Sequence, residues 1–373
     1  MLFGAAILVG ACGGDLDPAS RLVSFRSVAM RATRVVQSGT CDTGLVAAAD
    51  ARPGVPPKLG KTNCDVSGSY AHPGDDVQLE LLWHDPKPDA PRSWMWTTCV
   101  NPPSTTVFGC FQKLAQDLGK LPPDKRAEFF ASSVHIRENA LARTFETNEL
   151  AADPAADPRT LFRVKIPSDV LKDYEGKPPG AKKAATIGVV FFACPGKLRL
   201  TLDAAGAARN ALPVTCEDLQ TGEPLGTDKF TIGIKRVFLR ERDENQDPRV
   251  NAVLFDGKPW PANESRDVIA TCAGDEARFE RCSDPKPTIA IDLAKPYAEN
   301  GSDEFGEPFN EQVVVQFYVT EGLFEHDIKR AEDPVTQFAG RQGKLGDQHM
   351  WIVVRDNRGG VSWVERKFRV VPR

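Results

Sequence analysis

Apolar and polar side chains alternate along several short segments of the chain, and this period of two predicts β-strands. Between Val77 and Trp83 (VQLELLW) every second residue is apolar, so one face of the predicted strand is buried and the other meets solvent. The segment from Ile187 to Cys194 (IGVVFFAC) is apolar on both faces, which indicates a central strand. Further strands are predicted over residues 93–99, 161–166, 230–240, 250–255, 288–293, 312–319, 351–355 and 360–371.

Turn-forming residues separate these segments. The stretch from Arg355 to Gly360 (RDNRGG) predicts a hairpin, because Asn and Gly tolerate the positive φ that such a turn requires. The strands do not alternate regularly with long helices, so we expect antiparallel sheets that pack as sandwiches. The chain is therefore predicted to be mainly β.

The length of 373 residues suits two domains rather than one. We expect a first domain over residues 21–242, a linker at 243–248 and a second domain over 249–373. Near 111–185 the pattern changes to polar loops and short helical pieces, which predicts a partly helical insert in the first domain. Two such pieces are 123–131, which begins with proline, and 167–174, where Ser168 is the expected N-cap.

The N-terminus predicts export and lipid attachment. Residues 1–11 are apolar or small, a length typical of the apolar region of a signal peptide and too short to span a bilayer. The segment from Leu8 to Cys12 (LVGAC) resembles the lipobox of bacterial lipoproteins. The resemblance implies that Cys12 becomes the acylated N-terminus and that residues 12–20 form a tether. An ordinary cleaved signal peptide and a buried N-terminal strand remain as alternatives.

Eight further cysteines indicate disulfides. Their number is even, no CxxC or Cys/His cluster has zinc-ligand spacing, and disulfides are typical of exported proteins. Sequential pairing is the simplest of the 105 arrangements that eight cysteines allow. The expected pairs are Cys41 with Cys64, Cys99 with Cys110, Cys194 with Cys216, and Cys272 with Cys282.

The charge and composition of the chain limit the classes of partner that we expect. The net charge is −4 and the basic residues are interspersed with acidic ones, so no basic stripe is present and nucleic acid is not an expected partner. Beyond the N-terminus no apolar run reaches the roughly 20 residues of a spanning helix. The sequence also contains no motif that predicts a cofactor.

Several motifs together resemble bacterial lipoproteins with tandem immunoglobulin-like domains. They are the lipobox-like start, AHPGDDVQLELLW from Ala71, KRVFLRERDENQDPRVNAVLFDG from Lys235, and MWIVVRDNRGGVSWVERKFRVV from Met350. The resemblance covers most of the chain. It implies two immunoglobulin-like β-sandwiches anchored in the cell envelope, and the residue Gly13 after the cysteine favours the outer membrane. It implies no activity, because this fold serves many functions.

Few residues are candidates for chemistry. No nucleophile elbow, P-loop or dinucleotide motif occurs. The histidines are isolated in sequence, which favours structural or surface positions, and they are His72, His84, His135, His326 and His349. Carboxylate pairs of a polysaccharide-active enzyme can come together only in the fold, so they stay open.

Two further candidates each have a simpler alternative. The linker offers oxygen ligands for calcium at Asp243, Glu244, Asn245 and Asp247, although a solvated turn explains the same residues. Trp83, Trp94 and Trp96 suit a sugar-stacking platform, but tryptophan on strands more often fills a sandwich core. We predict no metal site.

The sequence thus favours a non-enzymatic envelope lipoprotein that binds, adheres or scaffolds. Its expected partners are the membrane, through the lipid, and an envelope protein or polysaccharide. A polysaccharide-active enzyme or its accessory module is the first alternative. A calcium-stiffened adhesion protein is the second.

Overall fold

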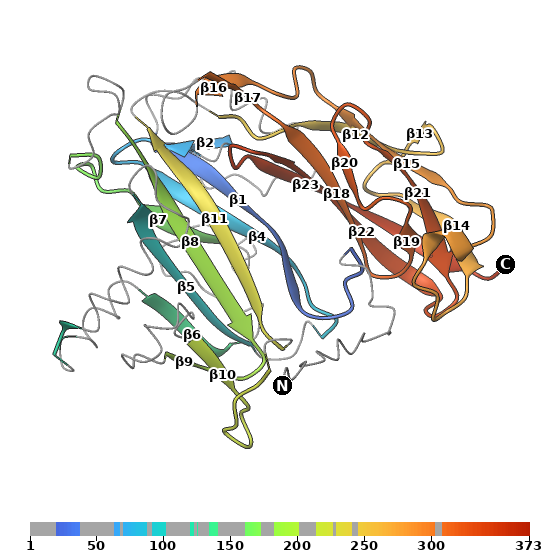
Figure 1. Cartoon of the computed structure of the whole chain (residues 1–373), viewed down its shortest axis with the longest axis horizontal. Helices are drawn as coiled ribbons and strands as arrows, with labels where there is room; N and C mark the ends of the chain where they lie inside the picture. The colour runs from blue at the N-terminus through green and yellow to red at the C-terminus, as the bar shows by residue number, and fades with distance from the viewer. Residues whose placement is uncertain are drawn as a thin grey trace, which may run out of the picture.

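The regular structure is almost entirely β-strand, as the alternating pattern predicts (Figure 1). The computed structural model describes residues 20–37, 63–67, 70–87, 92–101, 120–122, 125, 134–140, 161–172, 183–200, 214–226, 229–240, 245–302 and 308–373. Every strand predicted from the alternation lies on a strand of the structure. Cys12 and the whole of residues 1–19 lie outside the described part.

The N-terminal β unit, defined as strands β1 to β11, contains two facing sheets. One sheet has the order β2 (Asn63–Ser67), β1 (Arg26–Gln37), β4 (Asp76–His84) and β7 (Leu161–Lys165). The other has the order β3 (Tyr70–Ala71), β11 (Thr231–Arg240), β8 (Ala184–Cys194), β5 (Arg92–Asn101) and β6 (Val134–Ala140). Their inner faces share one core that includes Leu79, Trp94, Val189 and Leu239. The arrangement is that of a β-sandwich.

A hairpin of β9 (Lys197–Leu200) and β10 (Val214–Glu217) covers the outer face of the second of these sheets. Met95, Val190 and Phe192 point outward from β5 and β8 and pack beneath the hairpin. This second cover explains why β8 is apolar on both faces, as the sequence predicts for a central strand.

The C-terminal β unit, defined as β12 to β23, follows one path of hydrogen-bonded strands that folds over a second core. The order is β13 (Lys258–Pro259), β12 (Val250–Phe255), β15 (Thr288–Leu293), β21 (Val335–Arg341), β14 (Ser265–Cys272), β23 (Val361–Val371), β22 (Gly346–Asp356), β18 (Val313–Val319) and β20 (Ile328–Arg330). Strand β19 (Leu323–Phe324) pairs with β21, and β16 (Asn300–Ser302) pairs with β17 (Pro308–Asn310).

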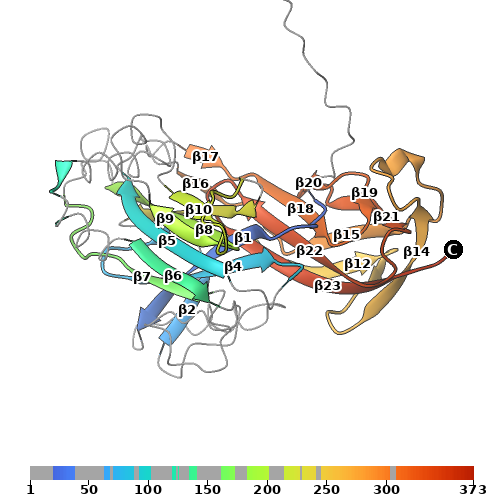
Figure 2. The same cartoon turned by 90° about the horizontal axis from the view of Figure 1, so that it is seen from below.

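The second core lies between the two ends of this path. Ile289 and Phe338 approach from one side, and Val315, Ile352 and Phe368 approach from the other. The predicted hairpin at 355–360 joins β22 to β23, and Gly359 has the expected positive φ of 96°. The two β units, each with its own core, lie side by side along the long axis of the molecule (Figure 2).

Two expectations need correction. Strand β3 runs parallel to β11, and β14 runs parallel to both β21 and β23, so the sheets are not purely antiparallel. The reason is that these strands enter their sheets through connections that cross from the opposite layer. Residues 168–172 form turns with bonds from Val170 N–H to Pro167 and from Lys172 N–H to Asp169, rather than a helix.

The predicted insert near 111–185 is described only in part. Residues 134–140 and 161–165 within it are strands. The segment at 123–131, predicted to be helical, lies outside the described residues except for Lys125.

Candidate functional site

The two β units meet at a buried joint, and the N-terminal segment contributes to it. Before entering β1, the chain lies against the end of β18 in the C-terminal unit. Leu22 N–H donates to Val319 O at 2.8 Å, and Val319 N–H donates to Ser20 O at 2.9 Å. Arg21 forms an ion pair with Glu321 at 3.2 Å. The first described residues therefore belong spatially to the C-terminal unit, although they precede the N-terminal unit in sequence.

The centre of the joint is apolar. The side chains come from the N-terminal segment and β1 on one side and from β22 and β23 on the other: Leu22, Val28, Ala29, Trp351, Val353, Val361 and Trp363, all buried. A β-bulge between Ser27 and Ala29 interrupts the pairing of β1 with β4. Because a bulge redirects a side chain, Val28 and Ala29 can both be buried toward the neighbouring unit.

Two arginines cross the joint. The Arg31 guanidinium lies 4.4 Å from the centroid of the Trp363 ring and forms an ion pair with Glu80. Arg355 donates to the carbonyl of Val28 at 2.6 Å, so the backbone carbonyl at the bulge is satisfied from the opposite unit. Both contacts have a directional geometry, which fixes the register of the units more strictly than apolar packing alone.

Histidine and tryptophan meet at one end of the joint. His84, the last residue of β4, lies with its ring centroid 5.3 Å from that of Trp351. His349 stacks on the same Trp351 at 5.7 Å, and its Nδ1 lies 2.6 Å from Glu365 Oε1. Burial lowers the pKa of His84 to about 4; Asp85 opposes this shift, while His349 and Lys344 add to it.

A polar cluster lies at the other end. Lys235 of β11 is only 5% exposed, and its ammonium donates to the carbonyl of Gly359 in the β22–β23 turn. Burial lowers the pKa of Lys235 to about 8, and the carboxylates of Asp247 and Asp356 oppose this shift. Burial also raises the pKa of Asp356 above its ordinary value. Below pH 8 the lysine is a buried cation between two carboxylate-bearing residues.

The linker is part of this cluster, and the expectation of a solvated turn is wrong for Asn245 and Asp247. Both are 2% exposed. Asp247 accepts a hydrogen bond from Val361 N–H at 3.0 Å, and Asn245 donates to Asp356 at 3.3 Å. The β22–β23 hairpin covers this part of the linker, so Asn245 and Asp247 make hydrogen bonds inside the protein. Asp243 and Glu244 lie outside the described residues.

The linker residues considered as alternative calcium ligands are not brought together as far as the structure describes them. No three His, Cys, Asp or Glu side chains among the described residues form a group suited to a metal ion. Asp247 Oδ1 and the Asn245 amide instead bond to the β22–β23 hairpin.

The tryptophans proposed as a sugar platform are core residues. Trp94 is fully buried and Trp96 is 7% exposed, and both belong to the first core. Trp83 is half-buried and makes edge contacts with Phe25 and Trp94. The core interpretation is therefore correct for this part of β4 and β5.

Two disulfides each join a cysteine to the next cysteine along the chain. Cys194–Cys216 ties β8 to the covering hairpin, and Cys272–Cys282 closes a loop at the end of β14. Cys99 is also disulfide-bonded. Cys41 and Cys110 lie outside the described residues, and nothing is described of the Cys64 side chain.

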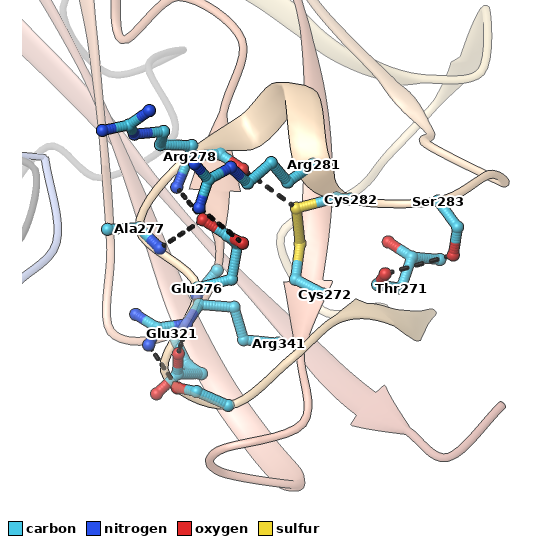
Figure 3. The surroundings of a disulfide bond; sticks show 12 residues. Thr271, Cys272, Glu276, Ala277, Arg278, Arg281, Cys282, Ser283, Glu321 and Arg341 are labelled. Atoms are coloured by element: carbon cyan, nitrogen blue, oxygen red, sulfur yellow. Dashed lines mark hydrogen bonds and ion pairs between the residues drawn. A yellow bond between two sulfur atoms is a disulfide. The ribbon is translucent and has the colours of Figure 1, made fainter. Parts of the chain in front are cut away.

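The surroundings of Cys272–Cys282 show how its loop is held (Figure 3). The Glu276 carboxylate accepts hydrogen bonds from the N–H groups of Ala277 and Arg278. Arg341, on the neighbouring β21, lies 3.5 Å from Glu321 and donates to the carbonyl of Gly274. These interactions provide partners for backbone N–H and C=O groups of the loop. Through Glu321, which also pairs with Arg21, they connect the loop to the N-terminal segment.

The histidines fall into different settings. His84 and His349 meet at the joint, His326 is exposed in a turn, and His72 lies beside Tyr70. The side chain of His135 is not described. Sequence reasoning missed the joint pair because the two residues are 265 positions apart. The available signal was that His349 and Trp351 share one face of a strand.

No family model and no curated protein matches the chain. Among solved structures, "BspA_C_mut" is similar at 9% identity over 91% of this chain and 98% of that one, with a TM-score of 0.19. The BspA C-terminal domain of Streptococcus agalactiae AgI/II polypeptide has 8% identity over 84% and 98%, with a TM-score of 0.17. Dimeric latent PorU from Porphyromonas gingivalis has 10% identity over 92% and 24%, also with a TM-score of 0.17. Likeness at this level assigns neither fold family nor function.

Among the described residues, no helix is both long and apolar enough to cross a membrane.

Proposed function

We propose that the chain is a lipid-anchored envelope protein that acts as a non-enzymatic scaffold or adhesion module, built from two immunoglobulin-like sandwiches. The anchor is Cys12, and the outer membrane is the proposed location. The partner is a protein or polysaccharide of the envelope.

The observation that carries the scaffolding role is the buried joint. A joint that combines Trp351 and Trp363 with the directional contacts of Arg31 and Arg355 holds two β units in one orientation. Interfaces that are small and polar allow domains to move, whereas a buried apolar interface opposes movement. A fixed orientation suits a spacer that presents loops at a set distance from its anchor.

The disulfides support the proposed location. Disulfides persist in oxidising compartments outside the cytoplasm. Cys194–Cys216 and Cys272–Cys282 lie in different β units, so both units carry this feature.

The experiment compares the wild-type chain with Cys12→Ser and with Gly13→Ala as a matched neighbouring substitution. We expect the wild type and Gly13→Ala to begin at Cys12 with acyl mass, by mass spectrometry of the N-terminal peptide. Cys12→Ser is expected to lack acyl mass and to leave the membrane fraction or stay unprocessed. An N-terminus elsewhere, or no acyl mass in the wild type, would rule out the anchor.

The non-enzymatic role has its own test. Purified wild-type protein is incubated with peptidoglycan and with envelope polysaccharide, and reducing ends are measured. We expect binding in sedimentation or cross-linking without turnover. Catalytic release of reducing ends would replace the scaffold by the polysaccharide-active alternative.

A further inference from the structure

One contact in the joint places a titratable ring from each unit on the same tryptophan. His84 of β4 and His349 of β22 both lie against Trp351, at centroid distances of 5.3 and 5.7 Å. Trp351 is only 6% exposed, so both imidazoles contribute to its burial. Together they lie where the N-terminal and C-terminal units touch.

Charged groups come from several of the elements around His84. Arg26 of β1 is opposite His84 in the strand register, and Asp85 follows it in the chain. Lys344 acts on it from the turn before β22, and Glu365 of β23 pairs with His349. Asp85 acts on His84 as a favourable charge, but its carboxylate already binds Arg92 through two bonds of 2.9 Å. The carboxylates around His84 that could stabilise its protonated form are therefore already paired with other residues.

We propose that this contact makes the joint acid-sensitive: protonation of His84 favours a state in which the two β units part at Trp351. The joint would be closed at neutral pH and loosened in an acidified environment. This proposal does not depend on the lipid anchor.

The sign follows from linkage. The pKa of His84 is about 4 in the closed joint, against 6.5 for a solvated histidine. A group whose pKa is lowered by closure binds more protons when the joint is open, so acid favours opening. The full difference would raise the open-to-closed ratio about twentyfold between pH 7 and pH 5. Because His84 is partly exposed to solvent, which screens its charge, we expect about tenfold.

Asp356 acts in the opposite direction, because burial raises its pKa and acid therefore favours its buried state. Lys235, at the same end of the joint, is protonated at both pH 7 and pH 5 and contributes no difference there. The contribution of His84 is isolated by comparing the wild type with His84→Phe at each pH. Phenylalanine keeps a ring against Trp351 but cannot titrate.

The experiment is hydroxyl-radical footprinting of the full chain at pH 7 and pH 5, in urea below the unfolding transition, with mass spectrometry. Opening exposes Trp351, whereas Trp260 is in the core of the C-terminal unit and serves as an internal reference. We expect the oxidation rate of Trp351, relative to Trp260, to rise about tenfold more in the wild type than in His84→Phe. His326→Gln, in an exposed turn, should behave as the wild type.

Three outcomes would overturn the proposal. They are an unchanged Trp351 rate in the wild type, an equal rise in His84→Phe, and an equal rise of Trp351 and Trp260, which indicates global unfolding. If His84→Phe does not fold, His84→Gln takes its place, since it also removes the titrating group. Solution scattering at the same pH values checks that the units separate, by a larger radius of gyration for the wild type at pH 5 only.

Discussion

At the scale of single residues, the joint depends on charged side chains at positions where a strand pattern predicts apolar ones. Lys235 points inward from β11 together with Gly233 and Val237, while Ile232 and Ile234 on the same strand are exposed. Burial of a cation is costly unless carboxylates accompany it, and Asp247 and Asp356 fill that role here. β11 thus buries a charged side chain and exposes apolar ones, and the buried lysine marks the place where the C-terminal unit covers this strand.

The pKa of Lys235 makes a prediction for stability at alkaline pH. Since this pKa falls from 10.5 in the unfolded chain to about 8 in the folded one, the unfolded chain binds more protons between these values. The free energy of unfolding should therefore rise from pH 8 toward pH 10.5, by at most about 3 kcal/mol. Urea unfolding of the wild type and Lys235→Met measures the difference.

The variant Lys258→Met, in the exposed strand β13, is the control for the loss of one positive charge. It should show the same dependence on pH as the wild type. A Lys235→Met variant with the same slope as the wild type would mean that this lysine is solvated.

At the scale of elements, the strands were predictable from the sequence and their neighbours were not. Alternation locates β4, β15 and β18 because each buries mainly one face, whereas β5, β8 and β22 bury side chains on both faces. Parallel pairing of β14 with β23 joins residues that are 102 positions apart in the sequence, such as Ser265 and Lys367, which no local pattern encodes. The burial of Asn245 and Asp247 was missed for the same reason. Their composition suits a turn, and it is the contact with the β22–β23 hairpin, distant in sequence, that helps to bury them.

The β9–β10 hairpin gives a prediction at this scale. Removing its bond to β8, by Cys194→Ala with Cys216→Ala, should lower the free energy of unfolding by about 3 kcal/mol, because the unfolded chain regains the freedom of a long loop. Hydrogen exchange should show protection lost in β9 and β10 but kept in β11. The measurement is urea unfolding together with exchange detected by mass spectrometry.

Removal of the other described disulfide provides the comparison. Cys272→Ala with Cys282→Ala should destabilise the C-terminal unit and leave the protection of β9 and β10 unchanged. Equal protection of the hairpin in both double variants would show that Met95, Val190 and Phe192 hold it without the bond.

At the scale of the whole molecule, the joint couples two units that have separate cores. The length of the chain predicted two domains, but no pattern in the sequence indicated that a segment ahead of β1 lies on β18. The contact of His84 with Trp351 was not predictable from the sequence either, because it exists only once both units are folded and docked. The candidate site was therefore almost entirely hidden from sequence reasoning, even though each contributing strand was found.

Coupling predicts one thermal transition for the wild type in calorimetry. Trp363→Ala removes a buried ring from the joint and the partner of Arg31, at a cost of about 3 kcal/mol. We expect the single transition to separate into two, because each core then unfolds independently. Trp260→Ala empties the second core rather than the joint, and should lower the transition temperature of the C-terminal unit.

A single transition in Trp363→Ala would show that the polar cluster around Lys235 is sufficient to couple the units. Two transitions in the wild type would show that the joint does not couple them at all.

The position of Ser20 to Leu22 on β18 also has a mechanical consequence. A pulling force applied to the chain ahead of Ser20 acts first on the two hydrogen bonds to Val319 and on the ion pair of Arg21 with Glu321. The load thus enters the molecule between its two units, close to the apolar centre of their contact, rather than at the far tip of either one. The two units would share the tension at the joint, and neither unit would bear it alone.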